Sequence, residues 1–148
     1  MKYSKATNYA LHAMVYLALT PKGKSIGVEH LAKMQGLSPT YLSKILTKLV
    51  KAGLIESTPG VNGGYSIVRH AHDISFLDVI HAIEGRTTLF SCSLEHEQQH
   101  GNEDCLIEHV MHTAEEKMKD ELSNRLIIDI AKQIELTKSR KINCNNSH

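Results

Sequence analysis

The chain has 148 residues, a length that suits one domain with a modest core, or a small domain plus a dimerisation element. Its formal net charge is only +1, which by itself indicates no nucleic-acid partner. No apolar run of about 18 residues occurs, which excludes a membrane-spanning helix, and the first residues carry no signal-peptide pattern. We therefore expect a cytoplasmic protein whose three cysteines are thiols, metal ligands or redox sensors rather than structural disulfides.

The charge is divided unevenly along the chain. Residues 1–85 hold nine Lys and Arg against five Asp and Glu, a net charge of +4, whereas residues 86–148 hold eight against eleven, a net charge of −3. This division predicts a basic nucleic-acid-binding head on a more acidic body. The expected parts are a DNA-binding domain at 1–85, a cysteine and histidine loop at 86–104, dimerisation helices at 105–135 and a flexible tail at 136–148.

The first predicted helix runs from about residue 5 to residue 20 and ends before Pro21. It is apolar nearly all round, so it should be covered on two sides, and the second cover is expected to be another subunit. Asn8 and His12 are four residues apart and therefore share one face. A second helix is predicted at 28–35, with inward side chains at Val28, Leu31, Ala32 and Met34.

The stretch from Gly36 to Ser66 predicts a turn, a short helix and a hairpin. Ser38 is a good N-cap, and Pro39 suits the first helical position, where a missing N–H costs nothing. A buried stripe is predicted at helical spacing, formed by Leu42, Ile45, Leu46 and Leu49. The outward face has hydroxyls, three lysines and no acid, and consists of Thr40, Tyr41, Ser43, Lys44, Thr47, Lys48 and Lys51. Such a face suits a helix that lies in a major groove and touches phosphates on either side.

Two short strands are predicted on either side of residues 59–64, where Asn62-Gly63 is a strong hairpin signal. A helix-turn-helix followed by a hairpin is a winged helix. The fold class is therefore mainly α, a winged helix-turn-helix with a small β-hairpin wing and a long C-terminal dimerisation helix. Ser38 and the wing residues Asn62 and Gly63 join the outward helix face as candidate DNA-binding residues.

The second half begins with a helix whose predicted N-cap is Asp73, followed by the polar loop 86–104. A long helix then opens at Cys105, with a predicted apolar stripe at Ile107, Val110, Met111, Ala114, Met118 and Leu122. Its expected solvent face is charged and includes Glu115, Glu116, Lys117, Lys119, Asp120 and Glu121. We expect this helix to form a two-fold dimer, which suits binding to a palindromic operator in double-stranded DNA. No periodicity is visible from Thr137 onward, so that segment is predicted to fray.

Several of these motifs together resemble one known family. They are Tyr9-Ala10-Leu11-His12-Ala13-Met14, the Ser-x-x-Tyr-Leu of 38–42, Leu49 to Ile55, Gly60 to Tyr65, Asp73-Ile74-Ser75, Cys92, and Cys105-Leu106. Over roughly residues 1–135 the chain resembles the bacterial winged-helix transcription regulators that include IscR, NsrR and CymR. The resemblance implies a homodimer that controls transcription, with its wing reaching a minor groove. Pro59 stands about where IscR carries a minor-groove arginine, so the DNA sequence that is bound should differ.

The resemblance also implies an iron–sulfur cluster, with a two-iron, two-sulfur form favoured. Cluster-binding members usually have three cysteines in this region; Cys92 and Cys105 match the outer two, and the middle one is missing. Three ligand sets remain open, and all of them contain the two cysteines. The further ligands are His12 with Asn8 from the partner's first helix, or His96 or His100, or Glu108 or His109. Mixed cysteine and histidine ligation raises the reduction potential of such a cluster.

The main hypothesis is a homodimeric repressor that senses redox, iron–sulfur or nitrosative status through Cys92 and Cys105. One alternative keeps DNA binding but has no cofactor, and makes the cysteines a thiol switch or leaves regulation to a protein partner. Another is an adaptor that binds no DNA. An enzyme is not expected, because the sequence has no nucleophile elbow, phosphate-binding loop or dinucleotide fingerprint.

Overall fold

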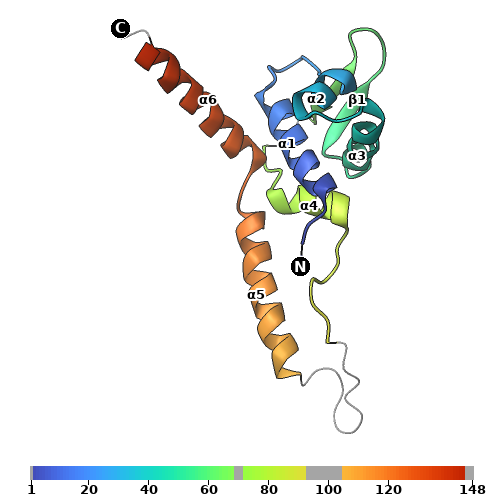
Figure 1. Ribbon diagram of the computed structural model, residues 1–148, viewed down its shortest axis with the longest axis vertical. Helices are drawn as coiled ribbons and strands as arrows, with labels where there is room; N and C mark the ends of the chain where they lie inside the picture. Colours follow the sequence, from blue (N-terminus) through green and yellow to red (C-terminus); the bar gives the residue numbers. More distant parts are fainter. Residues whose placement is uncertain (1, 69–71, 93–104, 146–148) are drawn as a thin grey trace.

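The computed structural model describes residues 2–68, 72–92 and 105–145, and side chains as far as residue 140. The elements in chain order are α1 (Lys5–Leu19), α2 (Val28–Gln35), α3 (Pro39–Lys51), β1 (Ile55–Thr58), β2 (Gly64–Ile67), α4 (Phe76–Glu84), α5 (Leu106–Ser123) and α6 (Ile127–Asn145). In Figure 1 the elements from α1 to α4 form a head, and α5 and α6 leave it in different directions. The winged-helix prediction is confirmed. None of the described helices is long and apolar enough to cross a membrane.

Helix α3 forms as its sequence signals predict. The Ser38 hydroxyl accepts a hydrogen bond from the Tyr41 N–H at 3.2 Å, and Pro39 occupies the first turn. The four predicted stripe residues, Leu42, Ile45, Leu46 and Leu49, are all buried. The local capping and the 3.6-residue period therefore determine which face of α3 enters the core. Met34 of α2 is 44% exposed, so the prediction that it points inward is wrong.

The wing is a two-stranded antiparallel hairpin in which Ile55 pairs with Ile67 and Thr58 with Gly64. Ile26 extends it, because Ile26 and Tyr65 exchange two backbone hydrogen bonds of 3.0 and 2.8 Å. Gly64 makes this approach possible. A Cβ atom at Gly64 would lie 2.5 Å from the Ile26 carbonyl oxygen, closer than real Cβ contacts come.

Helix α1 lies at the centre of the core and is in contact with α2, α3, α4, β2 and α6. Its buried residues are Thr7, Ala10, Ala13, Met14 and Leu17. The prediction that α1 is covered on two sides is confirmed. One of these covers is α6 of the same chain, because the chain turns back after α5 and lays α6 against α1. A cover from another subunit stays a prediction.

A capping box starts α4. The Ser75 hydroxyl accepts from the Asp78 N–H at 3.1 Å, and the Asp78 carboxylate accepts from the Ser75 N–H at 2.9 Å. The predicted N-cap, Asp73, is therefore wrong, since Ser75 and Asp78 each accept the open N–H of the other. Backbone bonds from Phe76 to Arg125 and from Ile127 to Ile74 attach the turn between α5 and α6 to the start of α4.

Helices α5 and α6 differ from expectation at two places. Glu115, expected on the solvent face of α5, is only 6% exposed. Helix α6 continues to Asn145, whereas the sequence predicted an irregular tail from residue 136. The outer part of α6 extends away from the head in Figure 1, and Leu136 within it is 61% exposed. A helix with no buried face there leaves no periodic signal in its sequence.

Candidate functional site

The outward side of α3 is the first candidate site. We define it as the reading face, which consists of Thr40, Tyr41, Ser43, Lys44, Thr47, Lys48 and Lys51. All seven side chains are exposed except Ser43, which is half-buried, and no carboxylate lies on the helix. Because the opposite side of α3 is anchored in the core, this face can present three cationic groups to a duplex without rearrangement.

Internal bonds already occupy some of the polar groups on α3. The Ser38 hydroxyl accepts a hydrogen bond from the Tyr41 N–H and therefore caps the helix. The Thr47 hydroxyl donates to the Ser43 carbonyl at 2.8 Å and keeps only its acceptor side for a ligand. The Tyr41 ring stands edge-on to Tyr9 of α1, with centroids 6.0 Å apart and an interplanar angle of 88°. Tyr41 is thus held in position from the core side while 41% of it stays exposed.

The tip of the wing has one exposed polar residue and one structural glycine. The Asn62 side chain is exposed, and its backbone carbonyl accepts from the Ser25 hydroxyl at 3.3 Å. Gly63 is half-buried, and a Cβ there would lie 2.0 Å from the Thr58 carbonyl oxygen. Gly63 therefore shapes the turn, and the Val61 side chain at the tip, which sequence reasoning did not select, is fully exposed.

Cys92, Cys105 and Glu108 form the second candidate site. Their ligand atoms all lie within 4.8 Å of one another, and each residue is half-buried. Cys105 is the N-cap of α5, Glu108 follows within its first turn, and Cys92 ends the described segment that follows α4. The structure thus brings together the two cysteines with Glu108, which is one member of the third predicted ligand set.

The other predicted ligands are placed elsewhere or lie outside the described residues. Asn8 and His12, predicted to act from the partner's first helix, are exposed on α1, and that ligand set stays a prediction; within the chain the His12 ring nitrogen Nδ1 bonds to the Asn8 carbonyl at 2.9 Å. His109 is exposed on α5 and is not part of the cysteine group. His96 and His100 are outside the described part of the chain.

The donor set fits an iron–sulfur group by its chemistry. Two thiolates are the soft ligands that such clusters and zinc prefer, and a two-iron cluster takes four protein ligands. Cys92, Cys105 and Glu108 supply three donors, so a fourth would have to come from outside this group. Their separation in the sequence is not that of a zinc finger.

A column of polar side chains continues from Glu108 along α5. The His112 ring nitrogen Nε2 lies 3.1 Å from the Glu108 carboxylate, and its other ring nitrogen lies 3.9 Å from Glu115. Lys119 pairs with Glu115 at 3.1 Å. These residues stand three or four positions apart, so their side chains follow one another on a single face of the helix.

Glu115 connects this column to the segment that carries Cys92. Its Oε1 atom accepts a hydrogen bond from the Leu89 N–H at 2.9 Å. That bond, followed by the pairing with Lys119, lowers the pKa of the Glu115 carboxyl against the opposing effect of burial. Sequence reasoning assigned Glu115 to solvent because it is charged. Its spacing from Met111, Met118 and Leu122, however, puts it on their stripe, and that spacing was the signal available.

A second carboxylate positions α1 beneath the reading face. Glu84, at the end of α4, accepts three bonds of 2.7 to 2.8 Å, from the Ser4 N–H, the Ser4 hydroxyl and the Thr7 hydroxyl. The bond from Thr7, together with those from Ser4, lowers the pKa of Glu84. These three bonds to Glu84 fix the first turn of α1, the helix that carries Tyr9. No motif pointed to it, because its partners are 77 and 80 residues away in the sequence.

Comparison with known proteins gives a consistent result. The family described as Rrf2, iron-dependent transcriptional regulator, matches residues 3–133. YffB of Lactococcus lactis, named as an HTH-type transcriptional regulator, is 43% identical over 90 residues, which cover 61% of this chain and 58% of YffB. The chain thus spans less than two thirds of that relative.

Two solved structures are similar to this chain at 26% identity. CymR, the global cysteine regulator of B. subtilis, has a TM-score of 0.70 over 90% of this chain and 98% of its own. IscR of T. potens has a TM-score of 0.70 over 90% of this chain and 88% of its own.

Proposed function

The chain belongs to the Rrf2 family of DNA-binding transcriptional regulators, which are not enzymes, and we propose that it is a homodimeric repressor controlled by an iron–sulfur group at Cys92, Cys105 and Glu108. It would bind a palindromic operator in the bacterial cytoplasm. The single observation that carries the sensing part is the convergence of two thiols and a carboxylate, from two separate parts of the chain, within 4.8 Å. Family membership disfavours the adaptor that binds no DNA.

The reading face and the wing supply the DNA-binding part of the proposal. Lys44, Lys48 and Lys51 are exposed and suit contacts to phosphates, which position a protein on a duplex. Thr40, Tyr41 and Ser43 occupy the start of α3, where a recognition helix contacts base edges. Asn62 at the wing tip suits an adjacent groove.

Exposed apolar side chains support the dimer. Leu106, Ile107 and Val110 at the start of α5 are 81%, 68% and 64% exposed. Single surface leucines need no explanation, but a cluster on a helix that projects from the head marks an interaction surface. A two-fold pairing of this surface would bring together two reading heads, as a palindromic operator requires.

The cluster would be held by Cys92, Cys105 and Glu108, and a different part of the structure positions each of them. A bound cluster supplies redox chemistry and reactivity toward oxidants and nitric oxide at this site. Cys105 caps α5, Glu108 is oriented by His112, and Cys92 lies three residues beyond the segment that Glu115 holds at Leu89. A change at the cysteines is therefore connected to the position of α5 relative to α4, and the regulator would pass between two states that differ in this packing.

The test begins with anaerobic purification. The protein should be coloured and contain iron and sulfide, Cys92→Ser should lose both, and Cys144→Ser, which alters the third cysteine, should keep them. Affinity for a duplex enriched by the protein from a random pool should then differ between the loaded and the metal-free forms at one salt concentration. A colourless, iron-free dimer that binds this duplex equally well in every preparation would overturn the sensing part and leave the DNA-binding part standing.

A thiol switch is the second candidate function, and a specific distance favours it. The two sulfur atoms lie within 4.8 Å, so a modest backbone movement would bring them to disulfide-bonding distance. Free-thiol counts before and after mild oxidant separate the two candidates. Loss of two thiols with no iron present favours the switch, and retention of all thiols contradicts it.

A further inference from the structure

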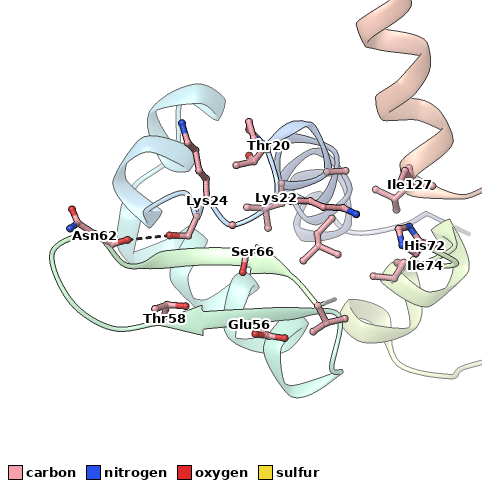
Figure 2. A pocket seen from close by; sticks show the side chains of 18 residues that line it. Thr20, Lys22, Lys24, Glu56, Thr58, Asn62, Ser66, His72, Ile74 and Ile127 are labelled. Carbon is pink, nitrogen blue, oxygen red and sulfur yellow. Dashed lines mark hydrogen bonds between the residues drawn. The ribbon is translucent and has the colours of Figure 1, made fainter. Parts of the chain in front are cut away.

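A cavity of about 680 Å³ lies outside both candidate sites, between the wing and the base of α6. Four parts of the chain line it: residues 17–25 at the end of α1 and in the turn that follows, the wing hairpin, residues 72–74, and the start of α6. Figure 2 shows the hairpin on one side, the end of α1 on the other, and Ile127 beside His72 and Ile74 at one end. Neither the reading face nor the cysteine group contributes to its lining.

Hydrogen bonds fix the walls of this cavity. Ile26 and Tyr65 exchange two backbone bonds, which hold the turn after α1 against β2. The Ser25 hydroxyl donates to the Asn62 carbonyl at 3.3 Å, and the Ile127 N–H donates to the Ile74 carbonyl at 3.0 Å. The shape of the cavity is therefore set before any ligand arrives, as is usual for small-molecule sites.

The lining has an apolar end and a polar end. Leu17, Ile74 and Ile127 are buried side chains, and Ile128 beside them is half-buried. Across from them, Glu56, Thr58 and Ser66 line the hairpin side. Figure 2 shows Lys22 extending along the cavity toward His72 and Ile127, whereas Lys24 turns away from the hairpin. The cavity is thus an apolar surface with a cation beside it.

Charge and size together define the ligand class. The lining holds two lysines, Lys22 and Lys24, and a histidine against one carboxylate, Glu56. The volume falls within the range of about 300 to 1,000 Å³ that small-molecule sites span. We propose that this cavity binds a small organic anion, whose apolar body packs on the half-buried Ile67, Val68 and Ile128 and whose acidic group pairs with Lys22. This goes beyond the regulator function, since the lining shares only Asn62 with the proposed DNA contacts and no residue with the metal site.

The position of the cavity would link anion binding to DNA binding. Its walls include β2 of the wing and the first turn of α6, the helix that follows the proposed dimerisation helix. An anion bound there contacts both elements at once. If the anion prefers one arrangement of the wing and α6, its binding would change the affinity for DNA. DNA would then change the affinity for the anion by the same factor.

The test uses 8-anilinonaphthalene-1-sulfonate, an anion with an apolar body, added to the full-length protein. Fluorescence should show saturable binding at one site per chain, which 4-methylpentanoate displaces. Ser66→Trp should fill the cavity and abolish this site, whereas Ser57→Trp, on the neighbouring strand and outside the lining, should leave it intact. Lys22→Glu should weaken binding at least about tenfold, because a hydrogen bond to a charged group is lost. Lys33→Glu, on an exposed surface of α2, is its control.

Two results would overturn the proposal. One is that the probe binds equally well to the wild type, to Ser66→Trp and Ser57→Trp, and to Lys22→Glu and Lys33→Glu, when circular dichroism shows that all of them are folded. The other is that Lys22→Glu leaves probe binding unchanged but weakens binding to random duplex DNA, which would make Lys22 a phosphate contact. Should Ser66→Trp fail to fold, Lys22→Glu against Lys33→Glu decides the question, since both lysines are exposed.

Discussion

Replacing Glu115 by Gln tests whether this buried carboxylate stabilises the protein. The side chain of Glu115 is 5% exposed, and its Oε1 atom accepts from the Leu89 N–H at 2.9 Å. Gln keeps the shape and one acceptor oxygen but removes the charge. Lys119, which is 33% exposed, loses its partner at 3.1 Å, and His112 loses a neighbouring anion.

The expected loss follows from these contacts. A hydrogen bond to a charged group is worth about 1.5 to 3 kcal/mol and a neutral one about 0.5 to 1.5, so the bond from Leu89 should lose about 1 kcal/mol. The pair with the partly exposed Lys119 adds no more than about 1 kcal/mol. The total of about 1 to 2 kcal/mol corresponds to a fall in Tm of about 2 to 8 °C for a chain of this size.

The pH dependence has a defined sign. The pKa of Glu115 is lowered in the folded protein, chiefly by the bond from Leu89, so its contribution to stability is present above the usual Glu pKa. That contribution is lost as pH falls below about 4.3, the value for an unperturbed Glu. The difference in Tm between the wild type and Glu115→Gln should therefore be full at neutral pH and should shrink in acid.

Thermal unfolding by circular dichroism at a fixed protein concentration measures both effects, and the concentration is fixed because dimerisation shifts Tm. Glu116→Gln is the matched control, because it removes the same charge from the next, exposed position on α5. Equal Tm values for the two variants at neutral pH would refute the assigned role of Glu115. A difference that persists unchanged in acid would refute its ionised state.

Three further predictions concern the head. Lys48→Ala and Lys51→Ala should each weaken binding to random duplex DNA and reduce the slope of log affinity against log salt by about one, which Lys117→Ala on α5 should not do; an unchanged slope would remove these lysines from the DNA contact. Gly64→Ala should lower the free energy of unfolding by about 1 to 3 kcal/mol, because its Cβ meets the Ile26 backbone at 2.5 Å, whereas Gly27→Ala enters open space. Glu84→Gln should lower Tm more than Glu29→Gln, an exposed control, since three donors at Ser4 and Thr7 lose a charged acceptor.

The reading helix and the wing could be predicted because their determinants are local. Ser38 and Pro39 mark the start of α3 within two residues, its buried stripe follows the helical period, and Asn62-Gly63 marks the turn. Each signal lies in the element that it specifies. The same local logic failed at Asp73, because two N-cap candidates stand two residues apart, and only Ser75 has Asp78 at the reciprocal position.

The candidate metal site and its supports could be predicted only in part. Cys92 and Cys105 stood out by type, but the placement of Glu108 beside them depends on how the first turn of α5 meets the segment after α4. Glu115 was misassigned because its charge was given more weight than its spacing from the apolar stripe of α5; its partner, a backbone N–H 26 residues earlier, could not be found from the sequence. The cavity beside the wing joins four separate parts of the chain, and no linear pattern encodes such a meeting.

The position of Glu115 leads to a last prediction about signalling. Helix α5 meets the segment after α4 at two places, at Cys92 through the candidate metal site and at Leu89 through Glu115. With the second attachment intact, a shift of α5 relative to α4 that follows a change at the cysteines is passed on to α4, which is in contact with both α1 and α3 of the head. Coupling requires such an element with two arrangements that both sites bias. Glu115→Gln should therefore reduce the ratio of operator affinities between loaded and metal-free protein, while the affinity of the metal-free form stays near the wild-type value. An unchanged ratio in a variant that has lost the expected stability would show that the signal travels by another route.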